Sequence, residues 1–160
     1  MARRSFKEAV QATPDIADAY KSGISALGSY SKKVVVPNKR LFGGSVDIDV
    51  ATKTLYPNDS RWDYAFDYSG ETFFIEIHPA NTVETRTVLN KLKWLKHWLQ
   101  SKAPELDEIK STKLHPFYWV QHSNYALPKN TSQYRMAAQA KLLPIKEWNY
   151  SKLIKQQLKK

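Results

Sequence analysis

The sequence predicts one mixed α/β domain (α+β in class), built on a three-stranded antiparallel meander with further strands and flanking helices. Its 160 residues are 42% hydrophobic, which is enough for a single hydrophobic core. The middle of the chain alternates apolar and polar residues with a period of two, which is typical of half-buried strands. A long segment of helical periodicity follows directly, and neither a linker nor a repeat divides residues 1–160.

The N-terminal region is expected to be helical with interruptions. We predict a short helix over residues 5–12. A second helix is predicted over residues 13–28, because Thr13 suits the N-cap, Pro14 the first helical position and Gly28 the position after the last turn.

Three strands are expected next. Residues 46–51 and 62–68 both alternate between apolar and polar side chains. The pair Ser69-Gly70 predicts a tight hairpin into a third strand over residues 72–78, which Pro79 ends. The three strands together form the meander.

The longest predicted helix spans residues 83–101, where Val88, Leu92, Leu95 and Leu99 form an apolar stripe at helical spacing. Most other positions on this segment are polar or basic. Beyond it we expect a loop, a buried strand over residues 116–121, a helix over 132–141, an edge strand or extended segment over 142–145, and a basic amphipathic helical tail over about 149–160.

Charge is the most informative feature of the composition. Lys and Arg number 25 against 15 for Asp and Glu, which gives a net charge of +10 and a pI near 9.7. Such a balance favours a polyanionic partner, either nucleic acid or an anionic membrane face, although a basic surface without such a partner is the alternative.

The chain contains no Cys, which excludes disulfides, Cys-ligated zinc and thiol catalysis. No apolar run follows the charged N-terminus, so we expect neither a signal peptide nor a membrane-spanning segment. A soluble, cytoplasmic protein is the expectation.

Acidic residues on the second and third strands suggest a site. By strand parity Asp63 and Asp67 share one face, as do Glu76 and His78, and hairpin pairing can bring Asp63 beside Glu76. Two adjacent carboxylates can hold a hard divalent cation. Glu76 lies in an apolar run, where an unpaired carboxylate is costly. The alternative is a solvated strand face that carries these charges.

Two short motifs now suggest a family. Trp62-Asp63-Tyr64, a hairpin, then Phe74-Ile75-Glu76-Ile77-His78 and a long helix together resemble the PD-(D/E)XK phosphodiesterase core. The resemblance covers roughly residues 5–121. It implies a restriction-endonuclease-like fold with the order helix, three-stranded meander, helix, strand, and it implies metal-dependent cleavage of DNA.

The resemblance also assigns roles by position. Asp63 and Glu76 would be catalytic and metal-binding carboxylates, and the carbonyl of Ile77 would be a further ligand. His78 would occupy the catalytic lysine position. Glu8 would match the accessory acidic residue of the first helix. The metal would be magnesium, or another divalent cation such as manganese.

Two positions depart from the family pattern. Trp62 replaces the proline before Asp63, and His78 replaces the lysine. A neutral histidine can polarise a water molecule but supplies no constant positive charge. A lysine from the following helix, such as Lys91, could restore that charge.

The long helix suggests a nucleic-acid surface. Trp94 could stack on an exposed base, although a solvated helix face is the alternative. The side chains expected to contact phosphates are Arg86, Lys91, Lys93 and Lys96.

Three functions remain open from the sequence. The leading hypothesis is a magnesium-dependent nuclease that acts on DNA, in preference to RNA, by attack of water. The second is a catalytically inactive nucleic-acid-binding domain on the same fold. The third is a structural subunit whose basic tail docks on an acidic partner. The sequence leaves the oligomeric state open.

Overall fold

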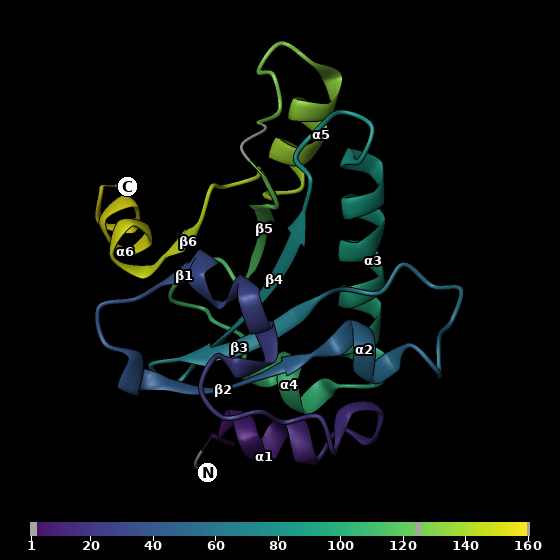
Figure 1. Cartoon of the computed structure of the whole chain (residues 1–160), viewed down its shortest axis with the longest axis vertical. Coiled ribbons are helices and arrows are strands. Elements are labelled where there is room, and N and C mark those ends of the chain that lie inside the picture. The colour runs from purple at the N-terminus through teal and green to yellow at the C-terminus, as the bar shows by residue number, and fades with distance from the viewer. Residues whose placement is uncertain (1–2, 124–125, 160) are drawn as a thin grey trace.

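The structure is a computed structural model that describes residues 3–123 and 126–159. Its centre is a four-stranded sheet with the order β2–β3–β4–β5. β2 (Phe42–Asp47), β3 (Tyr64–Tyr68) and β4 (Glu71–His78) are antiparallel neighbours, and β5 (Phe117–Gln121) lies parallel to β4 (Figure 1). The mixed α/β class and the meander are therefore confirmed.

Helices cover one face of this sheet. α1 (Phe6–Gln11), α3 (Thr85–Ser101) and α4 (Pro104–Ile109) enclose a core with buried aromatic side chains such as Phe74. α5 (Ser132–Gln139) packs beside one end of α3, on the side toward β5 (Figure 1). The connection from β4 to the parallel strand β5 runs through α3 and α4, as a parallel crossover requires.

The opposite face of the sheet carries a second core. Trp148 is fully buried at its centre, and its ring centroid lies 4.8 Å from that of Phe73 and 5.0 Å from that of Phe66. These contacts fix the C-terminal segment on the sheet. The elements of this layer are the 3₁₀ segment η2 (Ser25–Lys33), the parallel pair β1 (Val34–Val35) and β6 (Trp148–Asn149), and helix α6 (Tyr150–Leu158).

The hairpin between β3 and β4 sets the register of the two strands. Ser69 and Gly70 have φ values of 55° and 82°, the signs that a two-residue type I′ turn requires. Tyr64 consequently pairs with Ile75, close to the end of the ladder. The predicted tight hairpin is confirmed.

The prediction of a strand over residues 46–51 was wrong after Asp47. The chain turns there into helix α2 (Ile48–Thr52), and the Asp47 carboxylate caps it by accepting the N–H of Val50 at 2.9 Å. Ile48 is fully buried whereas Val50 is 68% exposed, so the two do not share a strand face. Three alternating residues are too few to separate the two periodicities, and the cap stabilises the helix once it forms.

The helix predicted over residues 13–28 was also wrong. Only the short 3₁₀ helix η1 (Pro14–Ile16) forms at its start. The N–H and carbonyl of Lys21 both bond to the backbone of Ser45, each at 2.9 Å. Pairing with the edge of β2 therefore outweighs the local helical preference.

Elements near the C-terminus follow the prediction more closely. The extended segment over residues 142–145 lies on the outer edge of β5, where Ile145 exchanges backbone hydrogen bonds of 2.8 Å with Trp119 and Gln121. The helical tail is α6, which the Asn149 side chain caps. Helix α4 begins at Pro104 where a loop was expected, and the short 3₁₀ helix η3 (Lys39–Leu41) was not expected from the sequence.

A buried carboxylate on β3 yields a test of the fold. Asp67 is 6% exposed, and burial raises its pKa to about 6, partly offset by the N–H of Gly70 and the charge of Arg3. Glu71 raises it further. A Cβ at Gly43 would lie 2.3 Å from Asp67 Oδ2, so only glycine permits this close approach.

We expect Asp67→Asn to stabilise the protein at pH 8 by about 1–2 kcal/mol. The folded state holds the Asp67 proton up to about pH 6, while the unfolded chain releases it near its ordinary pKa of 3.8. Stability from this group is therefore present below pH 4 and is lost as the pH rises to 6. Urea unfolding at pH 4 to 8 measures this, with the exposed Asp18→Asn as the control. Equal pH dependence in both variants would contradict the assignment.

Candidate active site

Two carboxylates meet beside the C-terminal half of β4. Asp63 directly precedes β3, and its N–H donates to Glu76 Oε1 at 3.1 Å. The N–H of Ile77 in turn donates to Asp63 Oδ2 at 3.0 Å. Each carboxylate thus accepts a backbone hydrogen bond from the strand that carries the other, and both lie on the sheet face covered by α3. The structure brings Asp63 and Glu76 together as strand parity predicted.

Burial perturbs both carboxylates. Glu76 is fully buried, and its desolvation raises its pKa to about 7. Burial also raises the pKa of Asp63, although Lys91 and the N–H of Ile77 act in the opposite direction. Carboxylates that are kept apart from water in this way are characteristic of functional sites, because they bind cations or protons strongly.

Lys91 of α3 forms ion pairs with both carboxylates. Its Nζ lies 3.3 Å from Asp63 Oδ1 and contacts Glu76 Oε2 directly. Burial by itself would lower the pKa of Lys91, but the charges of Glu76 and Asp63 outweigh it and raise the pKa. Lys91 is therefore a charged member of the cluster and is not part of the solvent-exposed basic face with which the sequence grouped it.

His78 links the cluster to a further acid. Its Nδ1 lies 3.2 Å from Glu76 Oε2 and its Nε2 lies 3.1 Å from Glu84 Oε2. Each ring nitrogen of His78 therefore faces a carboxylate oxygen, and such an oxygen can accept a hydrogen bond from a protonated ring nitrogen. The hydrogen bond to Glu76 is the main cause that raises the pKa of His78.

Glu84 is the member of this group that sequence reasoning missed. It stands at the N-cap of α3, and its own N–H donates to Asn81 Oδ1 at 2.9 Å. The available signal was an acidic residue at the start of a helix, six positions after His78, and many helices begin in that way.

More acidic residues lie around Asp63. Its backbone carbonyl accepts the N–H of Ile48 at 2.8 Å and of Asp49 at 3.3 Å, which ties the start of α2 to the site. Burial raises the pKa of Asp47, and the charges of Asp49 and Asp63 add to this effect. The start of α2 therefore brings negative charge close to the cluster.

The donors suit a small hard cation with a partly hydrated shell. The described residues contain no group of three or more His, Cys, Asp or Glu arranged to hold a metal ion. Magnesium is commonly held by one or two carboxylates, with water and substrate phosphates completing its shell. Asp63 and Glu76 supply the two carboxylates that such a site requires. In strand geometry the carbonyl of Ile77 faces the same strand edge as its N–H, which donates to Asp63.

Glu8 has a different role from the accessory one that the resemblance implied. Its side chain accepts the N–H of Ser5 at 3.0 Å, and the Ser5 hydroxyl accepts the N–H of Glu8 at 3.1 Å. This reciprocal capping box starts α1, and it lowers the pKa of Glu8. The helix that contributes a side chain to the carboxylate pair is α3, and α1 packs instead on β2 and α4.

The other basic residues of α3 lie away from the cluster. Arg86, Lys93 and Lys96 line a groove of about 250 Å³ between α3 and α5, together with Met136 and Ala140. Successive helical residues are rotated by about 100°, so Lys93 points about 200° away from Lys91. The four basic residues grouped by the sequence analysis therefore belong to two separate sites. We call the outer one the α3–α5 groove.

Trp94 is engaged within the protein. Its ring stacks on Trp98 with centroids 5.6 Å apart, and its Nε1 donates to Asp59 at 3.0 Å. The ring was expected to be available for base stacking, but these contacts already occupy one face and the polar edge of the indole.

Comparisons with known proteins add no relationship. No protein-family model matches the chain, and neither a curated protein nor a solved structure is significantly similar to it. Within the described residues, no helix has the length and apolar character needed to cross a bilayer.

Proposed function

We propose that this protein is a divalent-cation-dependent phosphodiesterase that cleaves DNA, on a divergent core of the PD-(D/E)XK type. The observation that carries the proposal is the position of Lys91 between Asp63 and Glu76. The sequence lacks a lysine after Glu76 in β4, and α3 supplies one to the same pair of carboxylates. An inactive binding domain has no need to bury two acids and a base together, because desolvation of charges is costly.

The residues can divide the chemistry among them. Asp63 and Glu76 would hold the cation, which when bound would stabilise negative charge on the phosphate and favour deprotonation of water. Lys91 would orient the attacking water and neutralise charge that develops on the scissile phosphate. His78, fixed between Glu76 and Glu84, would keep the Glu76 carboxylate in position.

Activity on labelled DNA duplex tests the proposal directly. We expect cleavage with magnesium or manganese at millimolar concentration and none in excess chelator. A parallel assay on RNA of the same sequence separates the two substrate classes. Absence of cleavage of both substrates with either metal would favour the inactive binding domain.

The basic surface supports nucleic acid as the substrate class. The net charge is +10, and no salt bridge within the described residues neutralises Arg86, Lys93 or Lys96 in the α3–α5 groove. Cations without a carboxylate partner that line one groove can displace the counterions of a phosphate backbone. This feature favours a polyanion over a small neutral substrate.

We expect binding to duplex DNA to fall steeply with salt. Each phosphate contact contributes a slope of about −0.9 in a plot of log affinity against log salt concentration. The double variant Lys93→Gln/Lys96→Gln should reduce the magnitude of the slope by about 1–2. Fluorescence anisotropy at about 50–200 mM salt measures it, and Lys53→Gln/Lys113→Gln is a control of equal charge elsewhere. An unchanged slope would place the contacts outside the α3–α5 groove.

A further inference from the structure

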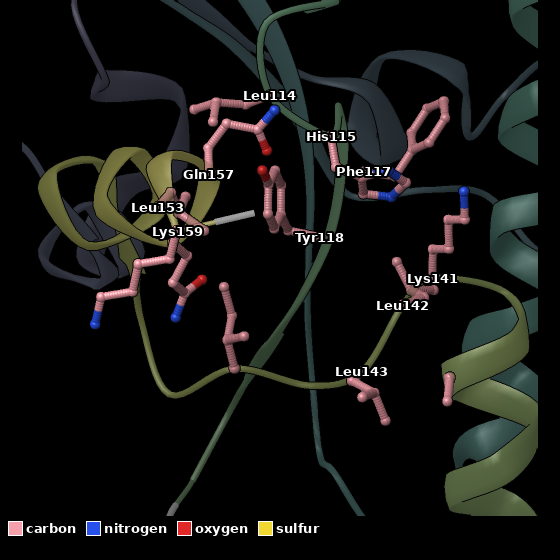
Figure 2. A pocket seen from close by; sticks show the side chains of 13 residues that line it. Leu114, His115, Phe117, Tyr118, Lys141, Leu142, Leu143, Leu153, Gln157 and Lys159 are labelled. Carbon is pink, nitrogen blue, oxygen red and sulfur yellow. The ribbon is translucent and has the colours of Figure 1, made fainter.

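A second cavity lies beside β5 and the segment that pairs with its outer edge, apart from the Asp63–Glu76 pair. Its volume is about 740 Å³, within the range of about 300–1,000 Å³ that is usual for small-molecule sites. β5, the segment after α5 and helix α6 form its walls (Figure 2). We call it the β5–α6 cavity.

An aromatic ring stands inside this cavity. Tyr118 projects from β5 toward α6, as Figure 2 shows. Its ring meets His115 and Trp148 edge-on, with centroids 5.8 Å and 6.0 Å away, and it is tilted against Phe73 at 6.3 Å. None of these contacts among the described residues is a parallel stack. A planar ring that enters the cavity can therefore stack on Tyr118.

The polar groups of the cavity are amides and cations. Gln156 and Gln157 of α6 contribute side-chain amides, which both donate and accept hydrogen bonds. Lys141 lies just after α5 and Lys159 at the end of α6, and Figure 2 shows them on opposite sides of Tyr118. No Asp or Glu is among the described residues that line it. The lining is therefore complementary to an anion with a planar, hydrogen-bonding body.

We propose that the β5–α6 cavity binds a nucleotide, with the base against Tyr118 and the phosphate at Lys141 or Lys159. The base edge lies within the reach of the glutamine amides of α6. Two sources share this chemistry, a free mononucleotide and an unpaired nucleotide within a nucleic-acid strand. The site is additional to the proposed cleavage site, because Tyr118 and Glu76 lie on opposite faces of the sheet.

Calorimetric titration of the whole chain with adenosine monophosphate tests the proposal. We expect it to bind at least tenfold more tightly than adenosine or inorganic phosphate, because only the nucleotide engages both the ring and a lysine. Tyr118→Leu should weaken its binding by about tenfold or more, the usual contribution of one base–aromatic stack. The double variant Lys141→Gln/Lys159→Gln should weaken the binding of the nucleotide and of phosphate but not that of adenosine. Lys53→Gln, which changes an exposed lysine outside the cavity, should have no effect.

A second variant guards against a folding defect. Leu153→Trp places an indole into the cavity from α6, outside the sheet, and should abolish nucleotide binding with an unchanged circular dichroism spectrum. If Tyr118→Leu weakens the binding of a short single-stranded DNA as much as it weakens the binding of the mononucleotide, the natural ligand is an unpaired nucleotide within a strand. If Tyr118→Leu weakens only the binding of the mononucleotide, the natural ligand is a free mononucleotide.

Several results would overturn the proposal. One is that the nucleotide binds no more tightly than phosphate, and another is that neither Tyr118→Leu nor Leu153→Trp affects its binding. A third is that decanoate displaces the bound nucleotide at a lower concentration than unlabelled nucleotide does, which would identify a site for fatty acids. Glu76→Gln, outside this cavity, should bind the nucleotide normally. Failure here is therefore distinguishable from failure of the proposed nuclease function.

Discussion

Glu76→Gln is expected to reduce metal-dependent cleavage of DNA by at least about 10³-fold while the protein remains folded. The amide keeps the shape of the side chain and can still accept the N–H of Asp63, which now donates to Glu76 Oε1 at 3.1 Å. It removes the anionic charge that a hard cation requires. Single-turnover cleavage of labelled duplex with a magnesium titration measures the loss.

Two comparisons make this result specific. Glu108→Gln alters an exposed glutamate of α4 and should cleave as the unaltered protein does. Full cleavage by Glu76→Gln in the presence of chelator would instead place the active site elsewhere. The similarity of Phe74-Ile75-Glu76-Ile77-His78 to the family motif would then be a coincidence of strand pattern.

Lys91→Met is expected to reduce both cleavage and stability. Removal of the ammonium leaves Asp63 and Glu76 without a cation, and loss of one partner from a buried ion pair costs about 3–5 kcal/mol. Cleavage should fall by about 10²–10³-fold, the usual effect of removing one charge-stabilising donor. Urea unfolding and single-turnover cleavage provide the two measurements.

The matched control for this variant is Lys93→Met, two positions away on the same helix and in the α3–α5 groove. It should leave stability within about 0.5 kcal/mol and retain the cleavage rate at saturating DNA. The double variant Lys91→Met/Glu76→Gln should lose less stability than the sum of the single losses, because the two groups interact directly. Additive losses would show that Lys91 acts independently of Glu76.

The carboxylate pair could be predicted from sequence because strand parity is a local rule. Asp63 and Glu76 each follow the alternation of their own strand, and the Ser69-Gly70 turn fixes how the strands pair. The role of Lys91 could be named only as one option among several lysines. Periodicity shows which side of α3 is apolar, but Lys91 lies at the margin of that side, where the packing against the sheet decides.

The failures lie where tertiary contacts outweigh local preference. Residues 46–51 could form either a strand or a turn into a helix, and the carbonyl of Asp63 selects the helix by accepting the N–H groups of Ile48 and Asp49. Residues 13–28 contain suitable helix signals, but Lys21 finds its partner on Ser45 of β2. Both decisions depend on segments distant in the chain.

The hairpin between β3 and β4 has a consequence for how such a chain can change in evolution. The reciprocal bonds between Asp63, Glu76 and Ile77 exist only while Tyr64 lies opposite Ile75. One inserted or deleted residue between them would rotate one carboxylate to the other side of the sheet. The thirteen-residue interval from Asp63 to Glu76 must therefore keep its length for the two carboxylates to stay together. The exposed residues between α2 and Arg61 do not set the register of these strands, so length variation in descendants of this sequence should be tolerated better there than in the hairpin.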